Sequence, residues 1–205
     1  MTDRIVRRTV AIAVLLVAAG GLGCSQTVRE GRSPAYLILE ELEAASVTEA
    51  DATPQFAQIL RSDVQTKGAV FEDLGQATFR LALKDIGDPA NPTAPTTNNF
   101  ITVNRYQVAY RRTDGRNTPG VDVPYPFEGA GTVTVGTDAV VLVFALVRIQ
   151  AKLEPPLAQL VALGGAQAIS TIADVTFYGR DQTGNDVVVN GSISVNFADW
   201  ADPEN

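Results

Sequence analysis

The clearest pair of strands in the sequence is ISTIADVTFY (residues 169–178) followed by DVVVNGSISVNF (residues 186–197). In both segments apolar side chains alternate with polar ones, a period of two that is typical of strands with one buried face. The expected inward-facing side chains are Ala173, Val175, Phe177, Val187, Val189, Ile193, Val195 and Phe197. The polar connection between the two segments predicts an antiparallel hairpin.

Five further segments are expected to be strands. Residues 76–84 alternate cleanly, whereas residues 100–111 change parity after Val103. A β-bulge near Asn104–Arg105 would return Tyr106, Val108 and Tyr110 to the core side. The other three expected strands are residues 35–42, 131–135 and 140–150. For residues 35–42 the start of a helix is the alternative.

The segments between these strands differ in character. Residues 140–150 are the most apolar run, which predicts a central strand covered on both faces. Residues 43–64 are irregular, with a short helix expected at 54–61, and a second short helix is expected at 157–163 after Pro156. Three long insertions are expected at residues 43–75, 113–128 and 151–168, and binding sites often lie in such loops.

About seven strands joined by Gly- and Pro-rich turns predict a mainly β protein, an antiparallel β-sandwich with one or two short helices. Residues 35–205 would form this single domain. The hairpin turn carries Asp181, Gly184 and Asn185, which resembles the late hairpin of bacterial immunoglobulin-like and fibronectin-like domains. Locally, the carboxylate can accept turn N–H groups, while Gly and Asn tolerate positive φ. The resemblance implies an immunoglobulin-like sandwich.

Composition excludes several chemistries. The 205 residues include no histidine and one cysteine, so a Ser-His-Asp triad, a Cys-His pair and a structural zinc site are all excluded. The net charge of −7 disfavours nucleic-acid binding, because an acidic domain repels phosphate backbones. We expect no cofactor and no metal.

The first residues have the three-part pattern of an export signal. Arg4, Arg7 and Arg8 precede the apolar run 10–19, and small residues follow it up to Cys24. A secreted protein cut by the ordinary signal peptidase and an uncleaved anchor helix are the alternatives.

The end of this segment, Gly23-Cys24, resembles the cleavage motif of bacterial lipoprotein signals, although Gly21 stands where that family has Leu. The resemblance implies cleavage before Cys24 and lipid on its sulfur and amino groups. Residues 1–23 would then be the signal peptide, and residues 24–34 a flexible tether. The mature protein would be lipid-anchored in the cell envelope, at the outer membrane if the source has two membranes.

Four residues in the turn-rich insertion are candidates for a partner-binding loop: Arg112, Arg116, Tyr125 and Phe127. Arginine provides bidentate contacts to carboxylates, and loop aromatics provide recognition surface. Arg105 and Arg111 are expected to face solvent, with Tyr106 and Tyr110 in the core.

Acidic residues offer two weaker alternatives. Turn carboxylates could bind calcium, the candidates being Asp85, Asp88, Asp181 and Asp186. Paired carboxylates could catalyse glycan hydrolysis, the candidates being Glu40, Glu41, Glu43, Glu72 and Asp73.

The leading hypothesis is a lipid-anchored, non-catalytic binding or structural module. Its partners would be the membrane, through lipid on Cys24, and another envelope protein, a polysaccharide or a copy of itself. The alternatives are a carboxylate-based envelope hydrolase and a small-ligand or calcium carrier.

Overall fold

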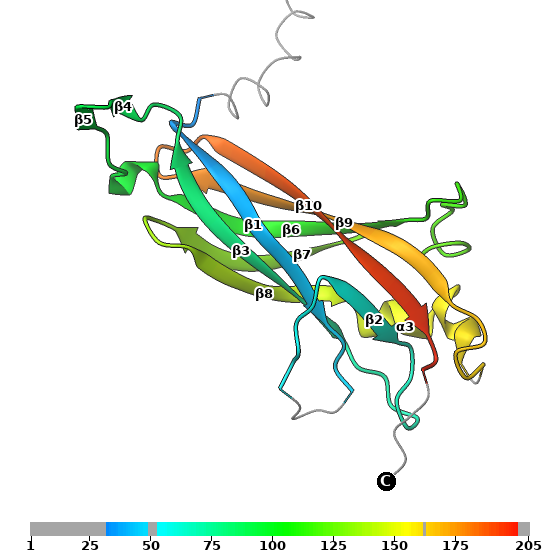
Figure 1. Cartoon of the computed structure of the whole chain (residues 1–205). Coiled ribbons are helices and arrows are strands. Elements are labelled where there is room, and N and C mark those ends of the chain that lie inside the picture. The colour runs from blue at the N-terminus through cyan, green and yellow to red at the C-terminus, as the bar shows by residue number, and fades with distance from the viewer. Residues whose placement is uncertain (1–31, 49–52, 162, 201–205) are drawn as a thin grey trace, which may run out of the picture.

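Two β-sheets, in which most strand pairs are antiparallel, make up most of the structure (Figure 1). The structure is a computed structural model that describes residues 32–48, 53–161 and 163–200. The three-stranded sheet has the order β1 (Ala35–Ala45), β3 (Asp73–Leu83), β8 (Val140–Val147). The five-stranded sheet has the order β2 (Ile59–Asp63), β10 (Asp186–Ala198), β9 (Ile169–Asp181), β6 (Ile101–Arg111), β7 (Phe127–Val135). The prediction of a mainly β protein with a sandwich of sheets is confirmed.

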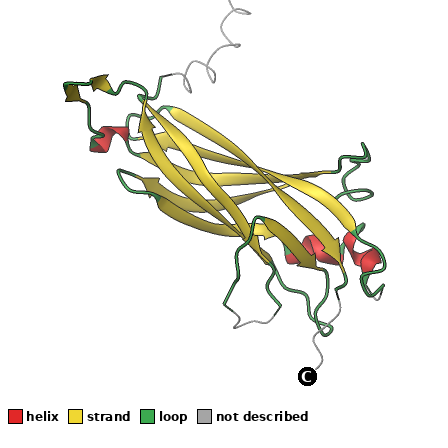
Figure 2. Ribbon diagram, in the orientation of Figure 1, coloured by secondary structure: helices red, strands yellow, loops and turns green. Residues whose placement is uncertain are grey.

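Short elements lie at the two ends of the sheets, as Figure 2 shows. The described helices are η1 (Thr97–Asn99), α3 (Ile149–Leu153) and η2 (Leu157–Leu160), and a two-residue strand pair is formed by β4 (Gly87–Asp88) and β5 (Asn91–Pro92). The second predicted helix, 157–163, is therefore a shorter 3-10 helix. None of the described helices is long and apolar enough to cross a membrane.

The core fills the space between the two sheets. Phe79 in β3 and Phe144 in β8 both meet Phe177 in β9 edge to face, with ring centroids 4.9 and 5.3 Å apart. Edge-to-face contacts of this kind add to the burial of apolar area. The three rings therefore join the two sheets at the centre of the sandwich.

The predicted β6 bulge and C-terminal hairpin are both confirmed. The register of β6 shifts between Val103 and Arg105, against both β7 and β9. The side chains that the bulge was expected to bring to one core side are all buried: Ile101, Val103, Tyr106, Val108 and Tyr110. β9 and β10 pair from Arg180 opposite Asp186 to Ile169 opposite Phe197. Their predicted inward side chains are buried, apart from half-buried Val189.

Residues 35–42 belong to β1, so the strand prediction is confirmed over its helical alternative. Ser33, expected in the tether, packs on the domain and is 2% exposed. The remaining tether residues, the signal segment and Cys24 lie outside the described residues.

The helix predicted at residues 54–61 is wrong. Residues Ile59–Asp63 instead form β2, which pairs in parallel with the end of β10, from Ser194 to Ala198. A strand this short gains its stability from the neighbouring strand rather than from its own sequence pattern, and therefore gives little periodic signal.

The prediction that residues 140–150 form a central strand covered on both faces is also wrong. β8 is the last strand of the three-stranded sheet, and Val141 and Val143 are 51% and 49% exposed. The run ends at Val147, after which the chain enters α3. One face of β8 packs in the core, and the other is open to solvent.

Candidate functional site

The four predicted loop residues do not form one exposed surface. Tyr125 is 53% exposed, whereas Phe127 is 8% exposed because it begins β7 and packs in the core. The guanidinium of Arg148 lies over the Phe127 ring, 4.2 Å from its centroid. Of the two predicted aromatics, only Tyr125 is available to a partner.

Arg112 and Arg116 are both paired with Asp114, at 2.6 and 2.8 Å. Hydrogen bonds from these two arginines hold the pKa of Asp114 far below its usual value. The Arg112 side chain is largely covered, and that of Arg116 is exposed. The turn is thus stabilised by ion pairs between its own residues.

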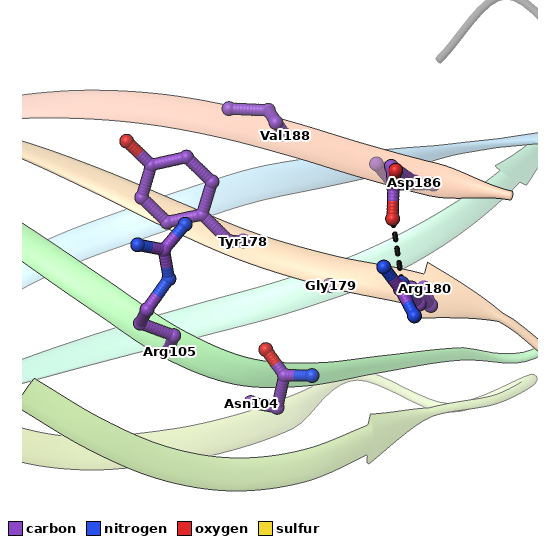
Figure 3. A pocket seen from close by; sticks show the side chains of 8 residues that line it. Asn104, Arg105, Tyr178, Gly179, Arg180, Asp186 and Val188 are labelled. Carbon is purple, nitrogen blue, oxygen red and sulfur yellow. Dashed lines mark hydrogen bonds and ion pairs between the residues drawn. The ribbon is translucent and has the colours of Figure 1, made fainter. Parts of the chain in front are cut away.

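A hollow of about 350 Å³ lies on the outer face of the five-stranded sheet (Figure 3). Side chains from β6, β9 and β10 surround it. The lining residues are Asn104, Arg105, Tyr178, Gly179, Arg180, Asp186, Val187 and Val188.

The β6 bulge gives the hollow its shape. The extra residue of the bulge allows two successive residues, Asn104 and Arg105, both to be exposed on the outer side of the sheet. Gly179 in β9 has to lack a side chain here, since a Cβ would lie 2.7 Å from the backbone oxygen of Thr102. The bulge and this glycine together bring the two strands close beneath the hollow.

Arg105 and Tyr178 form the most distinctive contact in the hollow. The Arg105 guanidinium lies 4.0 Å from the Tyr178 ring centroid, and it also pairs with Glu128 in β7 at 2.9 Å. The Tyr178 hydroxyl donates to Gln107 at 3.2 Å. The Arg105 guanidinium thus lies over the aromatic ring of Tyr178, and Figure 3 shows the two side chains close together.

The second cation, Arg180, pairs with Asp186 across the hairpin at 2.6 Å. Arg105 and Arg180 have side-chain exposures of 47% and 61%. Ion pairs this exposed contribute at most about 1 kcal/mol, so a ligand carboxylate can replace the resident one at little cost. Chemically, the hollow offers two guanidinium groups, an aromatic ring and the amide of Asn104 to a polar, anionic ligand.

The same face carries a third arginine outside the hollow. Arg111 donates to both carboxylate oxygens of Asp174, which also accepts from Ser192 at 2.6 Å. The prediction that Arg105 and Arg111 face solvent while Tyr106 and Tyr110 are buried is confirmed.

The predicted calcium ligands lie in turns and ion pairs. Asp181 accepts from the backbone N–H groups of Thr183 and Asn185 at 3.0 and 2.9 Å, and Asp85 and Asp88 accept from turn backbone groups. Gly184 has a φ of +89°. The predicted mechanism of this hairpin turn is confirmed. No three His, Cys, Asp or Glu side chains among the described residues are grouped to hold a metal.

The acidic residues considered for hydrolysis lie in different surroundings. Glu40 pairs with Arg80 on an exposed strand surface, whereas Asp73 is completely buried. Burial raises the pKa of Asp73, and the charge of Lys152 and hydrogen bonds from Ser62, Lys152 and Ser46 oppose that rise.

Sequence reasoning missed the partner of Asp73. Lys152 is 1% exposed and donates to Asp73 Oδ1 at 2.9 Å and to the Asp63 carbonyl at 2.7 Å. Ser62 donates to the other carboxylate oxygen. This cluster joins α3 to β2 and β3, and its burial keeps substrate away. Nothing in the sequence distinguished Lys152 from a surface lysine.

Comparison with protein-family models, with curated proteins and with solved structures finds no match for this chain. The functional proposal therefore depends on the chain's own residues.

Proposed function

We propose that the protein is a membrane-tethered, non-catalytic binding module whose hollow around Arg105 and Tyr178 takes an acidic polysaccharide of the cell envelope. The tether would be lipid on Cys24, on the strength of the basic, apolar and small-residue pattern that precedes it. The observation that carries the binding proposal is the position of the Arg105 guanidinium over the Tyr178 ring in an open hollow.

An immunoglobulin-like sandwich is part of this proposal, and the strand order supports it. In that fold strands A, B and E share one sheet and strands G, F and C the other, with C′ added next to C in variable-type domains. The orders β1-β3-β8 and β10-β9-β6-β7 match this arrangement. Two features depart from it: β2 adds to β10 in parallel, and no strand in the described residues takes the place of D beside β8.

If the chain is tethered through Cys24, we expect the hollow to lie near the membrane. Ser33, at the start of the described chain, is buried beside Asp181, which belongs to the hairpin turn next to the hollow. The loop before β7 and the helices α3 and η2 lie at the opposite end (Figure 1). If residues 24–32 form a random-coil tether, these nine residues would span about 15–18 Å, and the hollow would face material close to the bilayer.

The chemistry of the hollow favours an acidic sugar over a neutral one. Sugar rings pack on aromatic faces, and their carboxylates pair with arginine forks. Each guanidinium is already paired with a single carboxylate, that of exposed Glu128 or of half-buried Asp186, which a uronate can displace.

Calorimetric titration of the full chain with polygalacturonate tests the proposal, and neutral dextran is the reference polymer. Arg105→Gln should weaken binding about tenfold, a loss of about 1.4 kcal/mol. Arg111→Gln is the matched control, because Arg111 is an ion-paired arginine on the same face outside the hollow. Equal binding by all three proteins, or equal affinity for dextran, would contradict the proposal.

A further inference from the structure

The loop that follows β3 offers apolar surface with little charge at one end of the sandwich. It contains the two-residue strands β4 and β5, and it extends beyond the ends of the two sheets (Figure 1). Ile86 near its start is 73% exposed, the highest value for a large hydrophobic side chain among the described residues. Residues 86–100 contain a single charged side chain, that of Asp88.

An aromatic ring and a lysine lie on the strands next to this loop. Tyr36, the second residue of β1, is 56% exposed. The Lys84 Nζ atom lies 5.0 Å from the centroid of the Tyr36 ring, and Lys84 comes two residues before Ile86. Tyrosine and lysine combine an apolar body with a polar end, the combination that suits a membrane interface. We call Tyr36, Lys84 and Ile86 the tip residues.

The segment that leads from Cys24 joins the domain beside the tip residues. The backbone N–H of Lys84 donates to the Pro34 carbonyl at 2.9 Å. Cys24 lies nine residues before Ser33, so the chain between them reaches at most about 30 Å. β10 runs from this end of the sandwich to the opposite one over 13 residues, about 40 Å. The tip residues are thus at the end nearest to the proposed anchor.

We infer that the tip residues contact the lipid bilayer in which the lipid on Cys24 is embedded. Ile86 enters the boundary between headgroups and acyl chains, while the Tyr36 ring and the Lys84 ammonium lie at headgroup level. The inference rests on the lipid anchor of the proposed function and adds an orientation to it. Lipid on one residue leaves the domain free to tilt, and a second contact at the tip directs the opposite end away from the membrane.

The charges around the tip favour zwitterionic lipid over anionic lipid. Asp85 accepts from the Gly87 N–H at 2.9 Å, and Asp88 accepts from the Ala90 N–H at 2.8 Å. These carboxylates stabilise the loop and keep their negative charge next to Ile86. An anionic surface repels them, whereas phosphatidylcholine headgroups carry no net charge. The occupant of this surface is therefore a zwitterionic bilayer.

Tryptophan quenching in vesicles tests the contact, because the single tryptophan of the chain, Trp200, comes two residues after β10, at the far end of that strand. The lipidated protein is reconstituted in phosphatidylcholine vesicles with brominated acyl chains, which quench an indole that reaches them. Flotation with the vesicles confirms anchoring. Ile86→Trp should lose most of the emission that the added indole provides, with a shift to shorter wavelength. Wild type should keep its emission.

Val121→Trp is the matched control. Val121 is 67% exposed and lies in the loop before β7, at the opposite end of the sandwich. Its added indole should stay unquenched, with the emission of a tryptophan in water.

Two changes should release the tip from the bilayer. Tyr36→Asp in the Ile86→Trp protein should restore most of the lost emission, because it places a carboxylate at the contact. Tyr125→Asp, at an exposed position of the distal loop, should restore none. Replacing part of the phosphatidylcholine by phosphatidylglycerol should also reduce quenching. Melting temperatures in detergent check that each variant folds.

The outcomes separate the tip contact from the anchor. Equal quenching of Ile86→Trp and Val121→Trp, or an unquenched Ile86→Trp protein that floats with the vesicles, would overturn the inference alone. A wild-type protein that fails to float would overturn the proposed lipid anchor and the inference with it. Polysaccharide binding is measured separately, through Arg105→Gln.

Discussion

Lys152 and Asp73 form an ion pair, 2.9 Å between Nζ and Oδ1, in which neither side chain is exposed to solvent. The lysine comes from α3 and the aspartate from the first residue of β3, with Ser62 of β2 donating to the same carboxylate. One end of the sandwich is therefore held by a buried charge pair rather than by apolar packing alone.

Removal of the lysine alone should be strongly destabilising. Lys152→Met leaves the Asp73 carboxylate buried without its cation, and we expect the free energy of unfolding to fall by about 3–5 kcal/mol. The double variant Lys152→Met/Asp73→Leu should recover most of that loss, because it removes both charges. Arg80→Met, in the exposed pair with Glu40, is the control and should cost less than about 1 kcal/mol. Urea unfolding measures all three, and a Lys152→Met variant as stable as wild type would refute the structural role.

The turn between β9 and β10 should require glycine at position 184. Gly184 has a φ of +89°, and no atom lies within 4 Å of where its Cβ would be, so the cost of a side chain there is one of backbone conformation. Gly184→Val should lower the free energy of unfolding by about 1–2 kcal/mol, and Gly184→Asn by less. An unchanged melting temperature for the valine variant would show that the turn accepts another conformation.

Asp181 should make stability depend on pH. Its burial raises its pKa, but hydrogen bonds from Asn185, Thr183 and Ser33 together outweigh burial and leave the pKa below its usual value. A carboxyl with a lowered folded-state pKa stabilises the fold above its unfolded pKa of 3.8, and that stabilisation is lost as the pH falls through the folded value.

The melting temperature of Asp181→Asn should therefore lie below that of wild type at pH 7, with the gap narrowing below about pH 4. A gap that widened in acid would have the wrong sign and would reject this role for Asp181.

Local patterns predicted the strands whose side chains alternate. The parity change in residues 100–111 located the β6 bulge, because a bulge is the only way for Val103 and Tyr106 to face the same core. The Asp181–Gly184 turn could be predicted equally well, because its conformation depends only on residues within the turn.

Other features depend on residues far apart in the sequence. β2 is a strand because β10 lies beside it, and β8 is an edge although its composition is that of a central strand. The hollow needs Gly179 beside the β6 bulge, and Lys152 is buried only because Asp73, 79 residues away, meets it. Periodicity gives no information about such contacts.

The central claim is that lipid on Cys24 holds this domain at a membrane, and metabolic labelling tests it most directly. Cells expressing the full chain are given radiolabelled palmitate, and the protein is recovered and compared with Cys24→Ser. Label in the wild type and none in Cys24→Ser is the expected result. Equal label in both proteins, or none in either, would contradict the claim.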